Sequence, residues 1–161
     1  IAKIYQKNGA SCISVLSDKK YFSGSLEDVQ KVANFVQIPI IRKDFILEKT
    51  QIKQARLFGA NAVLLMVSIL KDIKILQEFR EYAEFFGMDC LVETHDEESI
   101  KIAVASGAKI IGVNSRDFTD LSVNLNKLPN LLDQIPNNKN IVKVAESGIY
   151  TPEDVQLVMP H

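Results

Sequence analysis

Side chains that can move protons or bind anions stand at the ends of short apolar runs in this sequence. Lys43 stands in the charged cluster after the run Pro39–Ile41, and Glu93, Asn114 with Arg116, and Glu146 follow the runs Cys90–Val92, Ile110–Val113 and Ile141–Ala145. A lysine and a carboxylate with suitable pKa values can act as general acid and general base. Together with an asparagine and an arginine, this set predicts acid–base chemistry on an anionic small molecule.

Each of these residues also has an ordinary interpretation. Lys43 belongs to the charged cluster 42–44, and most lysines are solvated surface residues. Glu93 could cap a loop or pair with a base. We expect His95 to be structural or solvated, because nothing pairs with it at a recognised spacing, and Asp117 could simply pair with its neighbour. Taken singly, none of these residues supports an enzymatic function.

The elements that carry these residues alternate in type along the chain. We expect strands at Cys12–Leu16, Pro39–Ile41, Ala62–Val67, Cys90–Val92, Ile110–Val113 and Ile141–Ala145, and helices at Leu26–Val36, Lys49–Phe58, Leu70–Phe86, Glu97–Ala105 and Lys127–Gln134. Ser25, Asp96 and Thr151 precede acidic residues, which is typical of helix N-caps. Four helix–strand joins contain a glycine, and each predicts a left-handed residue at the helix end: Gly9, Gly59, Gly87 and Gly107.

Strands that are apolar without alternation are buried on both faces, and helices between them indicate a parallel sheet. An open doubly wound sheet usually carries a G-x-G-x-x-G turn, which this sequence lacks. Polar residues follow nearly every strand, and this favours a closed barrel, whose active site draws on many strand ends. The predicted fold is therefore α/β, a (β/α)8 TIM barrel, of which six units are visible in one domain covering residues 1–161.

The composition excludes several classes of function. The net charge is −1 with no basic patch, so we expect no nucleic-acid partner, and the longest apolar run, Ala62–Val67, is too short for a membrane span. No zinc spacing, nucleophile elbow or Walker motif is present, and we expect no metal. Cys12 and Cys90 are interpreted as small buried hydrophobes in a reducing compartment, which predicts a cytoplasmic protein.

The strand-end motifs taken together resemble those of indole-3-glycerol phosphate synthases, in order through the whole chain. The matching segments are Ser14–Asp18 with Tyr21–Ser25, Pro39–Ile46, Gly59–Val67, Leu91–His95, Ile111–Asp117 and Val144–Ile149. They resemble the second to seventh strands of that family's barrel. Any one segment is a weak signal, but six in register are highly specific.

This resemblance implies a carbon–carbon lyase of tryptophan biosynthesis. Its substrate would be 1-(2-carboxyphenylamino)-1-deoxyribulose 5-phosphate, and its products indole-3-glycerol phosphate, carbon dioxide and water. The ring carbon that bears the carboxylate attacks the ribulose carbonyl, then decarboxylation and dehydration complete the indole. No cofactor is implied, because the anilino nitrogen of the substrate supplies electrons to the ring.

The resemblance also assigns roles to matching positions. Lys43 resembles the general acid that protonates the carbonyl oxygen, and Glu93 the carboxylate that removes a proton during dehydration. Asn114 and Glu146 resemble the residues that hold the ribulose hydroxyls and orient the lysine. The implied substrate-binding residues are Phe45 and Leu65 as walls for the aromatic ring, Arg116 as positive charge at the mouth, and Ser147 with Gly148 at the phosphate.

The sequence departs from the family pattern at both ends. The family's first strand, with a Glu-x-Lys motif, and its eighth strand, with part of the phosphate site, have no counterpart here, so we expect a domain truncated at both ends. A barrel opened in this way exposes two strand edges, which predicts self-association through those edges.

Two further functions stay open. One is another phosphate-binding barrel enzyme, such as a phosphoribosyl isomerase, although that family relies on a Cys or Asp pair at strand ends and neither Cys12 nor Cys90 stands at one. The other is a catalytically incomplete fragment, because half of the phosphate site is missing.

Overall fold

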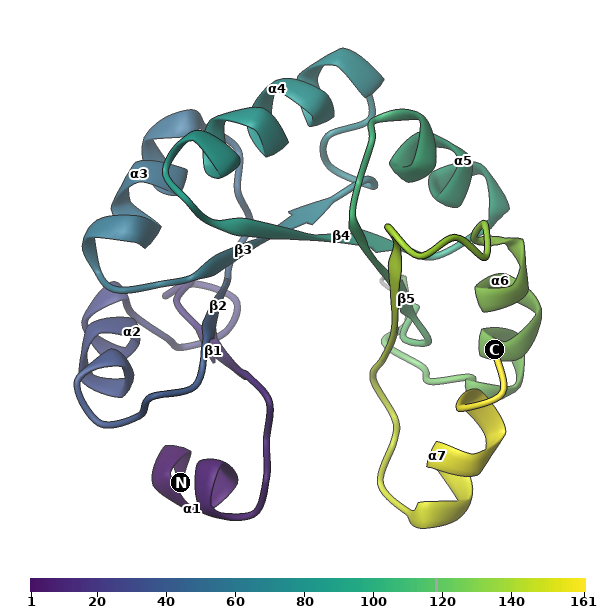
Figure 1. Cartoon of the computed structure of the whole chain (residues 1–161), viewed down its shortest axis with the longest axis horizontal. Coiled ribbons are helices and arrows are strands. Elements are labelled where there is room, and N and C mark those ends of the chain that lie inside the picture. Colours follow the sequence, from purple (N-terminus) through teal and green to yellow (C-terminus); the bar gives the residue numbers. More distant parts are fainter. Residues whose placement is uncertain (118) are drawn as a thin grey trace. The chain divides into compact units, whose positions relative to one another are not determined.

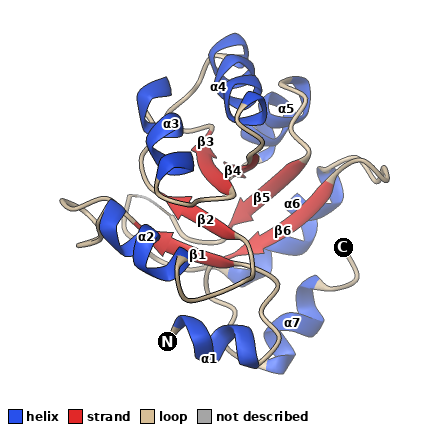
Figure 2. Ribbon diagram, turned by 60° about the vertical axis from the view of Figure 1, so that its left-hand side comes forward, coloured by secondary structure: helices blue, strands red, loops and turns tan. Residues whose placement is uncertain are grey.

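The structure is a computed structural model that describes residues 1–117 and 119–161. Strands and helices alternate along the chain (Figures 1 and 2), and every described pairing between strands is parallel. The chain divides into two compact units, one formed by residues 1–65 with 78–90 and the other by residues 66–77 with 91–161. The boundary passes through the third strand, the fourth helix and the fourth strand.

The first unit contains three neighbouring strands in chain order and the helices that connect them. Its elements are α1 (Ala2–Lys7), β1 (Ile13–Leu16), α2 (Leu26–Ala33), β2 (Ile40–Lys43), α3 (Lys49–Leu57), most of β3 (Ala62–Met66) and the second part of α4 (Ile73–Phe85). Val29, Ile40 and Ile52 are fully or almost fully buried in its core. Helix α2 packs against β1 and β2, which is the layer arrangement expected of βα units.

The second unit contains the other three strands. Its elements are most of β4 (Asp89–Thr94), α5 (Glu97–Ala105), β5 (Ile110–Asn114), a 3₁₀ turn (Leu125–Lys127), α6 (Leu128–Gln134), β6 (Val142–Glu146) and α7 (Pro152–Val158). Helices α5 and α6 pack against β5, and Ile100, Ile111 and Leu128 are buried between these elements.

Local sequence signals explain where the helices begin and end. The side chains of Ser25, Asp96 and Thr151 accept hydrogen bonds from backbone N–H groups in the first turns of α2, α5 and α7, which confirms the three predicted N-caps. Gly59 and Gly107, which follow α3 and α5, have φ values of 92° and 78°, as predicted for left-handed residues at helix ends.

Two expectations need correction. Strand β2 extends through Lys43 rather than ending at Ile41, so the lysine is the last residue of the strand and not a loop residue. Cys12 is exposed and precedes β1, whereas Cys90 is buried as expected, and both thiols are free. The apolar run at Cys12 does not bury its first residue, because the strand begins one residue later.

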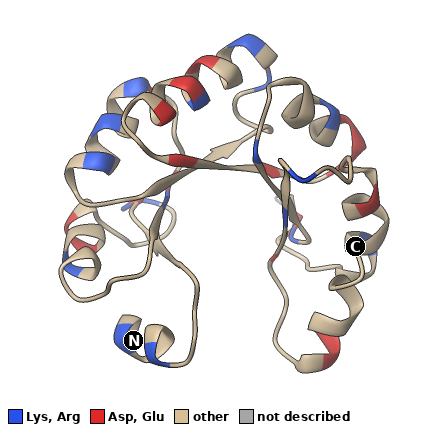
Figure 3. Ribbon diagram, viewed as in Figure 1, with Lys and Arg blue, Asp and Glu red and all other residues tan. Residues whose placement is uncertain are grey.

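Charged residues lie more often on the helices than on the strands (Figure 3). In the described part of the chain, no helix combines the length and the apolar character that a membrane span requires. The few charged residues on the strands, among them Arg42, Lys43, Glu93 and Glu146, are therefore conspicuous, and the last three of these are predicted catalytic residues.

Candidate active site

The end of β2 presents its side chains alternately to two faces. Arg42 and Asp44 are buried, whereas Lys43 and Phe45 are half-buried, as the two-residue period of a strand requires. Lys43 pairs in register with Leu16 of β1, and its carbonyl accepts a hydrogen bond of 3.0 Å from the Ser17 amide. The backbone of the predicted general acid is thus fixed by a parallel ladder.

An aromatic cluster surrounds Phe45 in the first unit. Its ring stacks on Phe22, with ring centroids 5.2 Å apart and an interplanar angle of 14°, and it meets the edge of Tyr21 at 5.4 Å. Offset or edge contacts of this kind stabilise ring packing and leave other ring faces available. Tyr21 is 64% exposed, so the cluster reaches the surface. These three rings can form a wall for a planar aromatic group.

Leu65, the other predicted wall residue, lies on β3 and has no exposed surface. All five residues of that strand are buried. The structure therefore shows Leu65 as a core residue, and its contact with a substrate ring stays a prediction.

The end of β4 carries a buried carboxylate and an imidazole that contact each other. Glu93 is 1% exposed, and its Oε1 lies 3.1 Å from His95 Nε2. The expectation that nothing pairs with His95 was wrong, because residues two apart on a strand project from the same face. That spacing was a signal in the sequence. A hydrogen bond from the imidazole would orient the carboxylate of Glu93.

A pocket of about 290 Å³ lies beside His95 in the second unit. Its lining consists of Val67, Ser68, Lys71, His95, Asp96, Glu98, Ser99 and Ile102. Lysine and carboxylate side chains of this lining, from Lys71, Asp96 and Glu98, therefore lie near His95, which contacts Glu93.

The start of α5 fixes the segment that follows His95. The Asp96 carboxylate accepts a 2.8 Å hydrogen bond from the Ser99 amide, and Ser99 Oγ accepts one of 3.1 Å from the Asp96 amide. The bond from the Ser99 backbone is the main reason that the pKa of Asp96 is below its ordinary value. This reciprocal cap stabilises the turn directly after Glu93 and His95.

Asn114 and Glu146 are partners in the parallel register of β5 and β6, so the structure brings these two predicted residues together. Asn114 is buried, and its Oδ1 accepts a 2.9 Å hydrogen bond from the Arg116 amide. The Glu146 carboxylate lies over Gly112 of β5, where a Cβ atom would collide with Glu146 Oε1. Gly112 thus provides the space that the carboxylate occupies. A glycine inside a strand is a recognised signal of close approach, so this contact has a signal in the sequence.

Arg116 contacts its own loop. Its Nη1 donates a 2.8 Å hydrogen bond to the carbonyl of Leu121, and its backbone forms an isolated bridge with Val123. Arg116 is half-buried. In this structure the guanidinium therefore stabilises its own loop by this hydrogen bond. Its contact with a substrate anion stays a prediction.

The turn after β6 has an unusual backbone. Ser147 and Gly148 have φ values of 68° and 72°. The Ser147 carbonyl accepts a 2.9 Å hydrogen bond from Ser115 Oγ, and the Ser115 amide donates one of 2.9 Å to the Glu146 carbonyl. Successive residues in unusual turn conformations can direct N–H groups toward an anion. This geometry is compatible with the predicted phosphate contact of Ser147 and Gly148.

Among residues 1–117 and 119–161, no group of His, Cys, Asp or Glu side chains is arranged to hold a metal ion. The candidate residues described above supply a lysine amine, two carboxylates, an imidazole, an amide and aromatic rings. These groups can protonate an oxygen, accept a proton and bind hydroxyl groups.

The sequence matches one protein-family model over residues 1–161, and that model is described as indole-3-glycerol phosphate synthase. Among curated proteins, it is similar to indole-3-glycerol phosphate synthases from Leptospira interrogans (48% identity over 96% of this chain), Methanocaldococcus jannaschii (46% over 99%) and Aquifex aeolicus (43% over 98%). The chain covers 60%, 58% and 61% of those three relatives, respectively.

Among solved structures, the chain is similar to the N-acetylmannosamine-6-phosphate 2-epimerase from Clostridium perfringens. The TM-score is 0.73 with 14% sequence identity, and the match covers 99% of this chain and 72% of the other. At this identity the similarity shows the fold alone. It confirms the predicted α/β class of TIM-barrel type.

Proposed function

Because the chain belongs to the indole-3-glycerol phosphate synthase family, we propose that the protein catalyses the reaction named by that family. The family consists of carboxy-lyases. The proposed substrate is 1-(2-carboxyphenylamino)-1-deoxyribulose 5-phosphate, and the products are indole-3-glycerol phosphate, carbon dioxide and water. The observation that carries the proposal is the match over all 161 residues, which includes every strand end that bears a candidate catalytic residue.

Ring closure is the first step of the proposed mechanism. The ring carbon that bears the carboxylate forms a bond to the ribulose carbonyl carbon, and Lys43 donates a proton to the carbonyl oxygen. The bond to the carboxylate then breaks, carbon dioxide leaves, and its electron pair returns to the ring. The half-buried position of Lys43 at a fixed strand end supports this role, because general acid catalysis needs a donor held near the accepting atom.

Dehydration is the second step. Glu93 accepts a proton from the CH2 group bound to the anilino nitrogen, and the electron pair of that C–H bond forms the double bond of the indole. The hydroxyl group on the neighbouring carbon takes up a proton from solvent and leaves as water. The contact between His95 Nε2 and Glu93 Oε1 supports this role, because it fixes the direction of the carboxylate. We propose that Asn114 and Glu146 hold the ribulose hydroxyls, since their strands place them in register.

The remaining groups would bind the two ends of the substrate. The stacked rings of Phe22 and Phe45 support a wall for the anthranilate ring. We assign the phosphate to the backbone of Ser147 and Gly148, with Arg116 as a source of positive charge and Leu65 as a further wall residue. A soluble phosphorylated substrate and two free thiols support a reducing cytoplasmic location.

The direct test is turnover of this substrate by the intact gene product that contains residues 1–161, measured by the fluorescence of the indole product. Lys43→Ala should lower kcat by at least about a hundredfold, the lower end of what a general acid contributes. Lys53→Ala is the matched control, because Lys53 is an exposed lysine of α3 in the same unit and its loss should leave turnover unchanged. Normal turnover by Lys43→Ala would exclude Lys43 as the acid, and absence of turnover by the wild type would contradict the proposed activity.

A further inference from the structure

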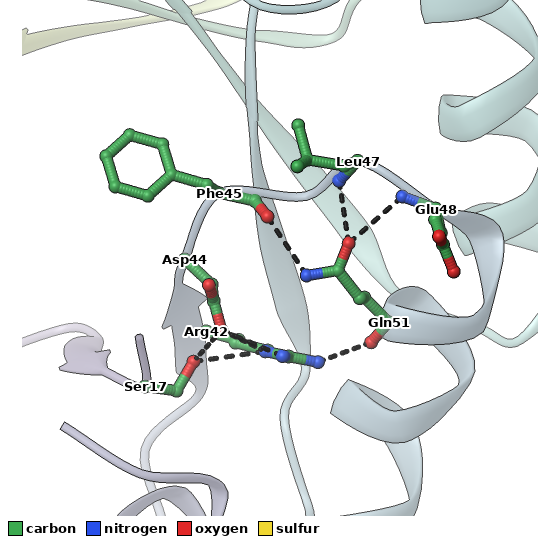
Figure 4. Close-up of polar contacts among 7 residues, drawn as sticks. All are labelled: Ser17, Arg42, Asp44, Phe45, Leu47, Glu48 and Gln51. Carbon is green, nitrogen blue, oxygen red and sulfur yellow. Dashed lines mark hydrogen bonds and ion pairs between the residues drawn. The ribbon is translucent and has the colours of Figure 1, made fainter. Parts of the chain in front are cut away.

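Three buried polar residues of the first unit, Ser17, Arg42 and Asp44, form a cluster at the end of β2, and the half-buried Gln51 lies beside them (Figure 4). Arg42 Nη2 donates a hydrogen bond of 2.8 Å to Asp44 Oδ2, and Arg42 Nε lies 3.1 Å from the same oxygen. Ser17 Oγ donates to Asp44 Oδ2 at 2.6 Å and accepts from Arg42 Nε at 3.0 Å. Arg42 is 3% exposed and Asp44 5%, so this ion pair is almost completely removed from water.

The cluster joins three elements of the first unit, of which only β1 is distant from the others in sequence. Ser17 follows β1, Arg42 and Asp44 flank the end of β2, and Gln51 lies in the first turns of α3. Arg42 Nη1 donates a hydrogen bond of 2.5 Å to the backbone carbonyl of Gln51, which ties the strand to the helix.

Gln51 extends the cluster along the loop between β2 and α3. Its Oε1 accepts hydrogen bonds from the amides of Leu47 and Glu48, at 2.7 and 3.0 Å, and its Nε2 donates to the Phe45 carbonyl at 3.0 Å (Figure 4). One side chain therefore binds three backbone groups of the loop. The loop backbone is fixed from Asp44 to Glu48 by the cluster and its extension.

Lys43 lies between the two charged members of this cluster. Because strand side chains alternate, Arg42 and Asp44 point to one face and Lys43 points to the other. Residues 42 and 44 are both fixed by hydrogen bonds, so the peptide units on either side of Lys43 are fixed as well. The direction of the Lys43 Cα–Cβ bond follows from these two anchors.

A buried ion pair is weak evidence for stability. Replacing such a pair by apolar residues is often neutral or stabilising, because removing two charges from water is costly. What the pair provides is a directional constraint: a planar guanidinium and a carboxylate satisfy each other only in a narrow range of geometries. This is the property that a catalytic strand end requires.

We propose that Ser17, Arg42, Asp44 and Gln51 form a positioning clamp that holds Lys43 in its reactive orientation. The clamp touches no substrate and acts through the backbone of β2. The inference rests on the proposed function, since it assigns the clamp a role in the reaction for which Lys43 is the acid.

The test compares clamp variants with a packing control in the intact gene product. Arg42→Lys keeps the charge but loses the planar fork, and Ser17→Ala removes one hydroxyl and is the milder change. We expect Arg42→Lys to lower kcat by about 10- to 100-fold, which a displacement of about 1 Å can cause, with a change in KM of less than about threefold. Val29→Ala opens a cavity in the same unit at a residue of α2 with no exposed surface, and it should leave kcat unchanged while the protein is folded.

A double-mutant cycle separates positioning from general damage. If the clamp acts through Lys43, then Arg42→Lys should lower the residual kcat of Lys43→Ala by less than about twofold. A full and additive loss in the Lys43→Ala background would overturn the proposal, and so would an unchanged kcat in both Arg42→Lys and Ser17→Ala.

A readout that does not depend on activity keeps the two proposals distinct. Reductive methylation of the folded protein gives the reactivity of Lys43 relative to the exposed Lys53, and amide hydrogen exchange reports on residues 40–48. Arg42→Lys and Ser17→Ala should change the Lys43-to-Lys53 ratio and speed exchange in that segment, whereas Val29→Ala should not. If the wild type fails to turn the substrate over, the proposed function is wrong. An unchanged ratio and unchanged exchange overturn the clamp regardless of turnover.

Discussion

The strand ends of the two units are fixed by different means. At the end of β2, a buried arginine, a carboxylate and a hydroxyl group fix the backbone around Lys43. At the ends of β5 and β6, Asn114 and Glu146 are fixed by the parallel ladder, and the turn that follows depends on one hydroxyl and two residues with positive φ. The first arrangement depends on charged side chains. The second depends mainly on backbone conformation and on the room that Gly112 leaves for the Glu146 carboxylate.

This difference predicts different sensitivities to mutation. A charged cluster is vulnerable to the loss of one partner, because the other charge is then left buried and uncompensated. The arrangement at β5 and β6 should tolerate the loss of a hydroxyl group. It should not tolerate an added Cβ atom at Gly112, where the Glu146 carboxylate already fills the space. The following substitutions compare the two strand ends, in order of expected effect.

The largest effect is expected from breaking the ion pair at β2. Asp44→Ala leaves Arg42 buried without its carboxylate and should lower the free energy of unfolding by about 3–5 kcal/mol. Ser115→Ala, the matched change after β5, removes only the hydrogen bond to the Ser147 carbonyl and should cost about 1 kcal/mol. Urea unfolding of the intact gene product measures both values. Equal losses would abolish the distinction between the two strand ends.

A smaller but more specific effect is expected at β5. Gly112→Ala introduces a Cβ atom into the space of the Glu146 carboxylate and should lower kcat by about a hundredfold, because the carboxylate must move. In a Glu146→Ala background that collision is absent and the new Cβ atom meets only Leu91 Cδ1, at 3.1 Å, so the same substitution should then have little further effect on kcat. Kinetic measurements on the four proteins of this cycle check the prediction. Additive losses would show that Gly112 acts independently of Glu146.

The end of β4 offers an intermediate case, in which one side chain orients another. His95→Leu removes the contact with Glu93 and should lower kcat by roughly tenfold, the equivalent of one hydrogen bond to a charged group. His95→Gln retains an N–H group at a similar reach and should retain most of the activity. If the two variants have the same kcat, the contact does not contribute to turnover.

The smallest effect is expected at the cap of α5, which follows His95. The pKa of Asp96 is below its ordinary value of 3.8 in the folded protein, mainly through the hydrogen bond from the Ser99 backbone. Its contribution to stability is therefore fully present above that value and is lost as the pH falls through the folded pKa. Asp96→Ala should cost about 1 kcal/mol at pH 7 and progressively less in acid.

Asp96→Ser is the control for this titration. A serine retains the cap but does not ionise, so its stability relative to Asp96→Ala should not vary with pH between 2 and 7. Urea unfolding across that range provides the comparison. A constant difference between the wild type and Asp96→Ala would contradict the linkage.

Much of the fold could be predicted from the sequence, because it depends on local signals. Apolar runs identify the six strands, and Ser25, Asp96 and Thr151 identify helix starts. The predicted burial of Cys12 was wrong, because an apolar run does not show at which of its residues the strand begins. Residues that meet through a parallel register, such as Asn114 and Glu146, were predictable once the strands were correctly placed.

The contacts that support the candidate site were harder to predict from the sequence. The contact between Glu93 and His95 could have been predicted from the two-residue period of a strand. The partners Ser17 and Arg42 are separated by 25 residues, and only the folded structure shows that they meet. A charged cluster after an apolar run does not reveal which of its members are buried, and here Arg42 and Asp44 are buried on the face opposite Lys43.

The clamp also has a consequence for how such a domain can change over evolutionary time. Most of its hydrogen bonds close within the stretch from Arg42 to Gln51, and only the Ser17 hydroxyl comes from outside that stretch. A segment exchanged between related proteins by recombination would therefore bring with it most of the hydrogen bonds that fix the backbone around Lys43. A single serine in the preceding βα unit would decide whether the transplanted segment is fully compatible with its new host.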